Sequence, residues 1–140
     1  MDAKQQAQAL FIDSFNGRSY KQKSNEVVDA SAVIVDKPSG GQFTGPKGIV
    51  DFTEGFTNAL PDLKGTLIEH KVNGNKVTTR VQGKGTFTGT MVTPQGSVPG
   101  NGNKLDLEYQ INSEYNDAGK LTRAEFSYDA QAFAKQLGLG

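Results

Sequence analysis

The 140-residue sequence contains no cysteine and only one histidine, His70, and these two shortages exclude several kinds of site. Without cysteine there is no disulfide framework, no thiol nucleophile and no thiolate metal site. A single histidine cannot build a multi-histidine metal centre, so we expect His70 to be a structural or surface residue. The sequence therefore predicts neither a metal nor a cofactor.

The chain also lacks a net charge and a long apolar run. Its 15 Lys and Arg residues balance its 15 Asp and Glu residues, whereas proteins that bind nucleic acids carry clustered positive charge to neutralise phosphates. No stretch approaches the roughly 18 apolar residues of a membrane span, and no basic segment followed by an apolar run opens the sequence. We expect a cytoplasmic protein with no nucleic-acid and no membrane partner.

The first 61 residues read as helices with one short strand between them. With 35% hydrophobic residues, residues 1–140 are expected to form a single domain. Apolar residues recur at helical spacing from Ala3 to Phe15, and Gly17 can end that helix. A short helix over 20–29, a strand over 32–36 and a break over 38–41 follow. Pro46 favours a further helix, and Pro61 supports its end.

The second half reads as strands, with a helix at its end. Leu63 to Val72 and Lys76 to Gly83 are predicted strands joined by a turn at Asn73-Gly74. Glycines at 83, 85 and 89 predict bulges or sharp bends, and 93–103 is a long turn-rich loop. Leu105 to Ile111 alternates strictly, a turn over 116–119 leads into a strand over 121–128, and 129–137 looks helical. Helices followed by a meander of strands indicate an α+β fold.

Three segments resemble a known family. They are Gly45-Pro46-Lys47-Gly48-Ile49-Val50-Asp51-Phe52 running into Ala59-Leu60-Pro61-Asp62-Leu63-Lys64, then Gly85-Thr86-Phe87-Thr88-Gly89, and finally Asp129 to Gln136-Leu137-Gly138. Over residues 43–138 the chain resembles the SnoaL-like polyketide cyclases (ester cyclases). The resemblance implies a nuclear transport factor 2-like fold, in which a bent antiparallel sheet forms a cone closed by helices. An apolar cavity inside such a cone is the expected ligand site.

Asp129 is the catalytic residue that the resemblance implies, since it matches the family's acid–base aspartate in an intramolecular aldol closure. A carboxylate in an apolar cavity has its pKa raised toward the working pH and can then exchange protons with a substrate. The competing hypothesis is an N-cap for the last helix, because an Asp at that place accepts backbone N–H groups.

Arg80 ends a valine-rich strand as in the family, and a substrate carbonyl or carboxylate is its candidate partner. The alternative is an arginine on the strand surface. On the last strand, Arg123 and Glu125 share one face with Asp129, as either substrate-binding residues or a solvated ion pair. The family typically has His and Trp at positions 124 and 125 and His at 87, so this chain has lost those rings.

Phe56, Phe87 and Tyr109 are candidate walls of the cavity, and for Phe87 core packing is an equal alternative. Two functions follow. The first is a cyclase or isomerase acting on a small apolar or polyketide-like molecule. The second is a non-enzymatic ligand-binding or dimeric scaffold protein of the same fold. A homodimer is expected, because part of the alternating strand from Leu105 to Ile111 lies on the open face of the sheet.

Overall fold

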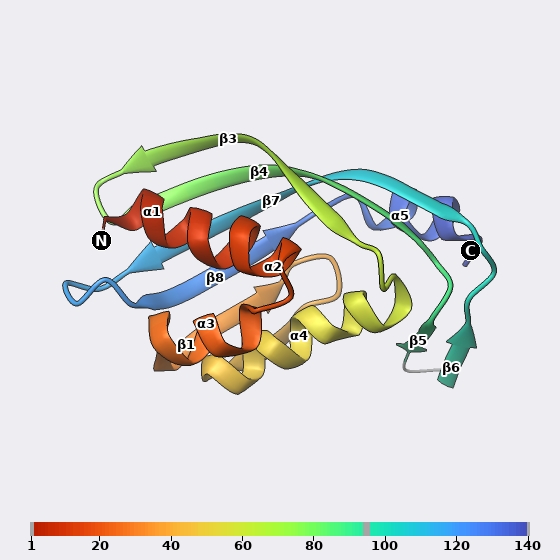
Figure 1. Ribbon diagram of the computed structural model, residues 1–140, viewed down its shortest axis with the longest axis horizontal. Coiled ribbons are helices and arrows are strands. Elements are labelled where there is room, and N and C mark those ends of the chain that lie inside the picture. The colour runs from red at the N-terminus through yellow and green to blue at the C-terminus, as the bar shows by residue number, and fades with distance from the viewer. Residues whose placement is uncertain (1, 94–95, 140) are drawn as a thin grey trace.

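The computed structural model describes residues 2–93 and 96–139. A six-stranded sheet with strand order β2-β1-β8-β7-β4-β3 curls over helices that come mostly from the first half of the chain (Figure 1). The last helix, α5, and a small second sheet of β5 and β6 lie at the end far from the N-terminus. The predicted α+β fold, a curved sheet closed by N-terminal helices with a short helix at the C-terminal end, is confirmed.

The N-terminal helix is continuous but contains a π-helical stretch. Its parts are α1 (Ala3–Ala7), the π-helix η1 (Gln8–Asp13) and α2 (Ser14–Asn16). Asp2 caps its start by accepting from the backbone N–H of Gln5, whose side chain in turn accepts from the backbone N–H of Asp2. The predicted stripe faces inward, with its central residues buried. Gly17 ends the helix as predicted.

A short helix, two strands and the longest helix follow. They are α3 (Tyr20–Val27), β1 (Val28–Asp36), β2 (Gly41–Thr44) and α4 (Gly45–Ala59). Strand β1 is longer than predicted, and β2 was missed because its four residues follow a glycine-rich turn. α4 starts with Pro in its first turn and ends before Pro61, as the sequence indicates. It packs against α3 and β1, which places its apolar side toward the sheet.

The predicted hairpin forms, with its turn shifted by one residue. β3 (Lys64–Asn73) and β4 (Lys76–Thr86) are antiparallel, and Asn73 pairs with Lys76. The turn is therefore Gly74-Asn75 and not Asn73-Gly74. Gly74 has a φ of 63°, and a glycine at the first central position gives a two-residue turn whose twist matches that of the strands.

The rest of the chain builds the centre of the sheet. β5 (Thr90–Thr93) and β6 (Gly96–Pro99) form a hairpin where we expected a loop, and residues 94 and 95 of that loop lie outside the described residues. β7 (Lys104–Tyr115) and β8 (Leu121–Ser127) are antiparallel, and α5 spans Ala130–Leu137. β1 runs parallel to β8, so the sheet is mixed and not purely antiparallel.

The apolar side chains of β7 lie on the opposite face of the sheet from the one that we expected. Leu105 and Ile111 are buried inside the molecule, and the outward positions of the strand hold polar residues such as Glu108 and Asn112. The open face of the sheet is therefore polar at this strand. The sequence feature from which we expected a homodimer lies on the inner face instead.

Two glycines in the sheet make room for a tyrosine ring rather than forming bulges. β4 pairs with β7 in one unbroken register through Gly83 and Gly85, so of the bulges or sharp bends predicted there, the bulges are wrong. A Cβ on Gly83 would lie 3.0 Å from Cε1 of Tyr109, and one on Gly65 would lie 3.1 Å from its hydroxyl and 2.8 Å from Cγ1 of Val81. The glycines thus let the ring of Tyr109 lie across β3 and β4.

We predict that Gly65→Ala lowers the free energy of unfolding by about 1 to 3 kcal/mol, because the new methyl group overlaps the stiff, fully buried side chain of Val81. The matched control is Gly55→Ala in α4, where nothing lies within 4 Å of the new methyl. Urea denaturation should show the control to be more stable than wild type by up to about 1 kcal/mol. Equal stabilities for the two variants would contradict this packing.

Candidate functional site

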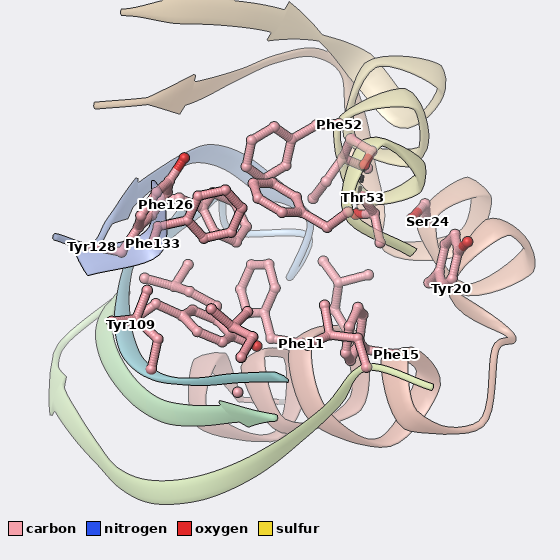
Figure 2. A pocket seen from close by; sticks show the side chains of 18 residues that line it. Phe11, Phe15, Tyr20, Ser24, Phe52, Thr53, Tyr109, Phe126, Tyr128 and Phe133 are labelled. Carbon is pink, nitrogen blue, oxygen red and sulfur yellow. Dashed lines mark hydrogen bonds between the residues drawn. The ribbon is translucent and has the colours of Figure 1, made fainter. Parts of the chain in front are cut away.

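A cavity lies between the concave face of the sheet and the helices. Its volume is about 90 Å³. Figure 2 shows aromatic side chains arranged around it: Phe11 and Phe15 from the N-terminal helix, Phe52 from α4, and Tyr109 from the sheet. The complete lining is Leu10, Phe11, Phe15, Tyr20, Ser24, Ile49, Phe52, Thr53, Phe56, Leu63, Gly83, Leu105, Leu107, Tyr109, Ile111, Phe126, Tyr128 and Phe133.

The lining is almost entirely apolar. Among the residues that line it in the described part of the chain, none is Asp, Glu, His, Lys or Arg. The ionisable side chains that line it are three tyrosines, at positions 20, 109 and 128. Whatever polar chemistry occurs inside the cavity therefore depends on hydroxyl groups.

The three tyrosines differ in what their hydroxyls contact. Tyr20 shares a hydrogen bond with Oγ1 of Thr57 at 3.3 Å, and Tyr128 donates to Oδ2 of Asp36 at 3.3 Å. For Tyr109 no hydrogen-bond partner is found among the described residues, and burial raises the pKa of its hydroxyl. Tyr109 is thus a neutral phenol at physiological pH with a donor that is free to meet a ligand.

Asp129 is not among the residues that line the cavity. It precedes α5 as its N-cap, is exposed, and its Oδ1 accepts from the backbone N–H groups of Gln131 at 3.0 Å and Ala132 at 3.1 Å. These are the contacts that the N-cap hypothesis expects. The acid–base role of Asp129 stays a prediction.

Arg80 lies on the outward face of β4, between carboxylates of the two neighbouring strands. It donates from Nη1 to Glu69 at 2.9 Å and from Nε and Nη2 to Glu108 at 2.9 and 3.0 Å. These hydrogen bonds raise the pKa of Arg80 and lower the pKa values of Glu69 and Glu108. Its donors are engaged on the side of the sheet away from the cavity.

Arg123 and Glu125 share one face of β8, as predicted, and form an ion pair at 2.8 Å. The hydrogen bond from Arg123 is the largest cause that lowers the pKa of Glu125. With residues of β4 and β7 they line a polar groove on the outward face of the sheet. Their predicted role in substrate binding therefore concerns a different surface from the cavity.

The three predicted aromatic walls separate into two groups. Phe56 and Tyr109 line the cavity. Phe87 does not line the cavity; it is fully buried and packs with Leu60, Leu105 and Leu137 in a second apolar cluster, which is the core packing that was the alternative for it. The structure thus brings together two of the seven predicted site residues at the cavity.

A model of one protein family matches the chain over residues 5–137, and its description is SnoaL-like polyketide cyclase. The chain belongs to this family. No curated protein matches it in sequence.

Solved structures share the fold of this SnoaL-like chain at low sequence identity. A candidate SnoaL-like polyketide cyclase from Jannaschia sp. CCS1 is 16% identical with a TM-score of 0.85, and the match covers 99% of this chain and 92% of that one. IdmH, a candidate polyketide cyclase from Streptomyces antibioticus, is 20% identical with a TM-score of 0.78 over 99% of both chains. TerC, co-crystallised with polyporic acid, is 18% identical with a TM-score of 0.74 over 98% of this chain and 99% of its own.

The SnoaL-like chain shares the nuclear transport factor 2-like fold of these structures, as the resemblance implied. Within residues 2–93 and 96–139, no three acidic or histidine side chains gather where they could hold a metal ion. Among the helices of the same residues, none combines the length and the apolarity that a membrane crossing requires.

His70 links β3 of the SnoaL-like chain to its π-helix. Its Nε2 lies 3.0 Å from Oε1 of Gln8, and its Nδ1 lies 2.9 Å from Oγ1 of Thr79. Because the amide oxygen can only accept, Nε2 carries the proton and Nδ1 accepts from the threonine. Burial, and then the positive charge of Lys4, lower the pKa of His70. These contacts match the structural role that we expected.

Asp36 and Tyr128 are the residues that sequence reasoning missed. Asp36 ends β1 before a glycine-rich turn, and a terminal Asp there reads as an ordinary turn residue. Its contact with Tyr128 spans 92 positions of the sequence. The available signal was the alternation of β1, which places Asp36 on the same face as the buried Ala32 and Ile34.

We predict that Asp129→Ala lowers the free energy of unfolding by about 1 kcal/mol, because two backbone N–H groups at the start of α5 lose their acceptor. Asp129→Asn should stay close to wild type, since an asparagine oxygen caps a helix equally well. Chemical denaturation of the three proteins measures the difference. If both variants lost stability equally, the charge of Asp129 rather than its capping oxygen would be responsible.

Proposed function

We propose that this SnoaL-like protein binds a small molecule with an apolar body and an oxygen acceptor in the cavity between sheet and helices. The observation that carries the proposal is the hydroxyl of Tyr109, which has no hydrogen-bond partner among the described residues and lies in a mostly apolar lining. A ligand carbonyl would supply an acceptor for this donor. The apolar walls would contribute affinity by removing the rest of the ligand from water.

The size of the cavity limits the ligand. A volume of about 90 Å³ is below the roughly 150 Å³ of an engineered cavity that admits benzene. It is also well below the roughly 300 Å³ at which sites for drug-sized ligands begin. The cavity is therefore smaller than a single aromatic ring requires, and an aromatic ligand or a larger polyketide-like molecule would require the half-buried side chains around it, such as Phe56 and Phe133, to move aside.

Family membership supports a small organic ligand of this kind. The family model describes polyketide cyclases, and one structural neighbour, TerC, was co-crystallised with polyporic acid. Both findings agree with a site that encloses a mostly apolar molecule and holds its oxygen atoms at a few hydroxyl groups. The non-enzymatic binding protein that the sequence also allows uses the same cavity.

A cyclase or isomerase reaction is the second candidate function, favoured by the family to which the chain belongs. In its predicted form Asp129 exchanges protons with the substrate and Arg80 polarises a carbonyl. Because Asp129→Asn preserves the cap, turnover of a polyketide-like ester by wild type and its loss in this variant would assign the chemistry to Asp129. Unchanged turnover in Asp129→Asn would remove that assignment.

The test of binding compares two ligands of equal shape, acetophenone and ethylbenzene, in wild type and Tyr109→Phe. Wild type should hold the ketone through one more hydrogen bond, and its loss costs about 1 kcal/mol, or about fivefold in Kd. We expect Tyr109→Phe to bind acetophenone more weakly than wild type does and to bind ethylbenzene equally well. Titrations followed by NMR chemical shifts give the Kd of each of the two ligands for each of the two proteins.

The control is Tyr115→Phe, which removes a buried hydroxyl that donates to Ser113 outside the cavity lining and should leave the acetophenone dissociation constant unchanged. Thermal unfolding of each variant checks the fold. If neither compound shifts the signals of cavity residues in wild type, the cavity is not a ligand site. An equal loss for both compounds in Tyr109→Phe would show a packing effect instead of a hydrogen bond.

We further infer that the protein acts in the cytoplasm as a homodimer, with the outward face of the sheet as the contact. Within the described residues, no helix lies on the outward side of the sheet (Figure 1). Polar side chains on this face, among them Arg80 and Glu108, form cross-strand hydrogen bonds. Multi-angle light scattering at micromolar concentration should give twice the monomer mass of 15.0 kDa. A mass near 15 kDa would remove the prediction.

A further inference from the structure

Tyr128 is the cavity tyrosine whose hydroxyl contacts a carboxylate. Its ring lines the cavity beside Phe56 and Phe133, at 6.1 and 5.6 Å between ring centroids. Its hydroxyl donates to Oδ2 of Asp36 at 3.3 Å. Among the described residues, no other cavity-lining side chain is hydrogen-bonded to an acidic group.

Asp36 is buried although no cation pairs with it in the described part of the chain. The residue is 7% exposed and lies on the inner face of β1, where Ala32 and Ile34 belong to the core. Oδ2 also accepts from Oγ of Ser39 at 2.6 Å. Oδ1 is enclosed and has no hydrogen-bond partner among the described residues.

The hydrogen bonds that Asp36 accepts from Ser39 and Tyr128 do not require a charged acceptor. A buried carboxylate with an unpaired oxygen is unfavourable, and an asparagine could still accept the hydrogen bond from Ser39. The charge therefore weakens the folded state while it acts on Tyr128. This combination indicates a functional rather than a structural reason for the carboxylate.

We propose that Asp36 and Tyr128 form a recognition site for a hydroxyl group of the ligand, so that the cavity selects a phenol or an enol over the corresponding ether. Asp36 is the positioning residue, and the Tyr128 oxygen is the atom that the ligand contacts. The inference deepens the proposed function and rests on it, because it names the class of molecule that the cavity holds.

The direction of the hydrogen bonds determines this selectivity. Because Tyr128 gives its proton to Asp36, its oxygen is left as an acceptor, and the carboxylate strengthens that acceptor by polarising the O–H bond. The free hydroxyl of Tyr109 offers a donor elsewhere on the lining. A ligand with one oxygen acceptor and one hydroxyl donor, such as a hydroxylated aromatic ketone or an enolised carbonyl compound, satisfies both groups.

The test compares p-cresol with 4-methylanisole, which differ by a methyl group on the oxygen. A purely apolar cavity would favour the ether, because burying an unpaired hydroxyl is unfavourable. We expect wild type to bind p-cresol more tightly, and Tyr128→Phe to reduce the ratio of the two constants about tenfold. Asp36→Asn should reduce it by a smaller factor, because the amide oxygen accepts from Tyr128 without the charge.

Two control variants separate recognition from structure. Ser39→Ala removes the other hydrogen bond to Oδ2 of Asp36 without touching Tyr128, and Tyr115→Phe removes a buried tyrosine hydroxyl that does not line the cavity. Both should keep the wild-type ratio. Asp36→Asn should unfold at a temperature no lower than wild type, whereas a purely structural Asp36 would lose stability and leave the ratio unchanged.

The outcomes separate this inference from the function on which it rests. If both compounds bind wild type and Tyr128→Phe keeps the same preference for p-cresol, the recognition site is overturned while ligand binding in the cavity stands. If neither compound binds, the proposed function fails and this inference fails with it. Should Tyr128→Phe not fold, the Asp36→Asn ratio decides: an unchanged ratio overturns the proposal and a lowered one supports it.

Discussion

The scarcity of polar partners in an almost wholly apolar lining is the constraint on which the site depends. In such surroundings each hydroxyl must find a partner or remain a free donor. The hydroxyl of Tyr20 is hydrogen-bonded to Thr57, and that of Tyr128 is hydrogen-bonded to Asp36. The hydroxyl of Tyr109 has no hydrogen-bond partner among the described residues. The apolar walls can contact many kinds of ligand. The hydrogen bonds that these hydroxyls make or lack therefore determine which ligand the cavity selects.

Backbone geometry keeps the Tyr109 hydroxyl in that position. Glycines on β3 and β4 leave space under its ring, and the unbroken pairing of β4 with β7 fixes which face of β7 turns inward. A shift of one residue in that register would exchange Tyr109 and Ile111 for Glu108 and Gln110. The sheet register thus determines the chemistry of the interior as well as its shape.

The sequence was informative where periodicity or a single strong residue decides the structure. Pro46 and Pro61 bound α4, Gly17 ends the first helix, and strict alternation marks β7. It was less informative about which face of a strand turns inward, since alternation defines two faces without saying which one the helices cover. Gly83 indicated a bulge or a sharp bend because the sequence shows only a missing side chain, and a glycine is equally suited to a bend of the backbone and to space for a neighbouring ring.

The candidate site was only partly predictable for the same reason. Tyr109 and Phe56 were found as apolar ring residues on elements that face the core, whereas Arg80 and Arg123 were chosen for their chemistry and lie on the outward face. Asp36 escaped notice because its significance comes from a contact with Tyr128 far along the chain.

A crystal structure of the protein grown with saturating acetophenone tests most directly the central claim that the interior cavity is the ligand site. We predict electron density for the ring within the apolar lining, with the ketone oxygen at hydrogen-bonding distance from the Tyr109 hydroxyl. Density only in the polar groove beside Arg123 and Glu125, or an interior without ligand, would contradict the claim and move attention to the outward face of the sheet.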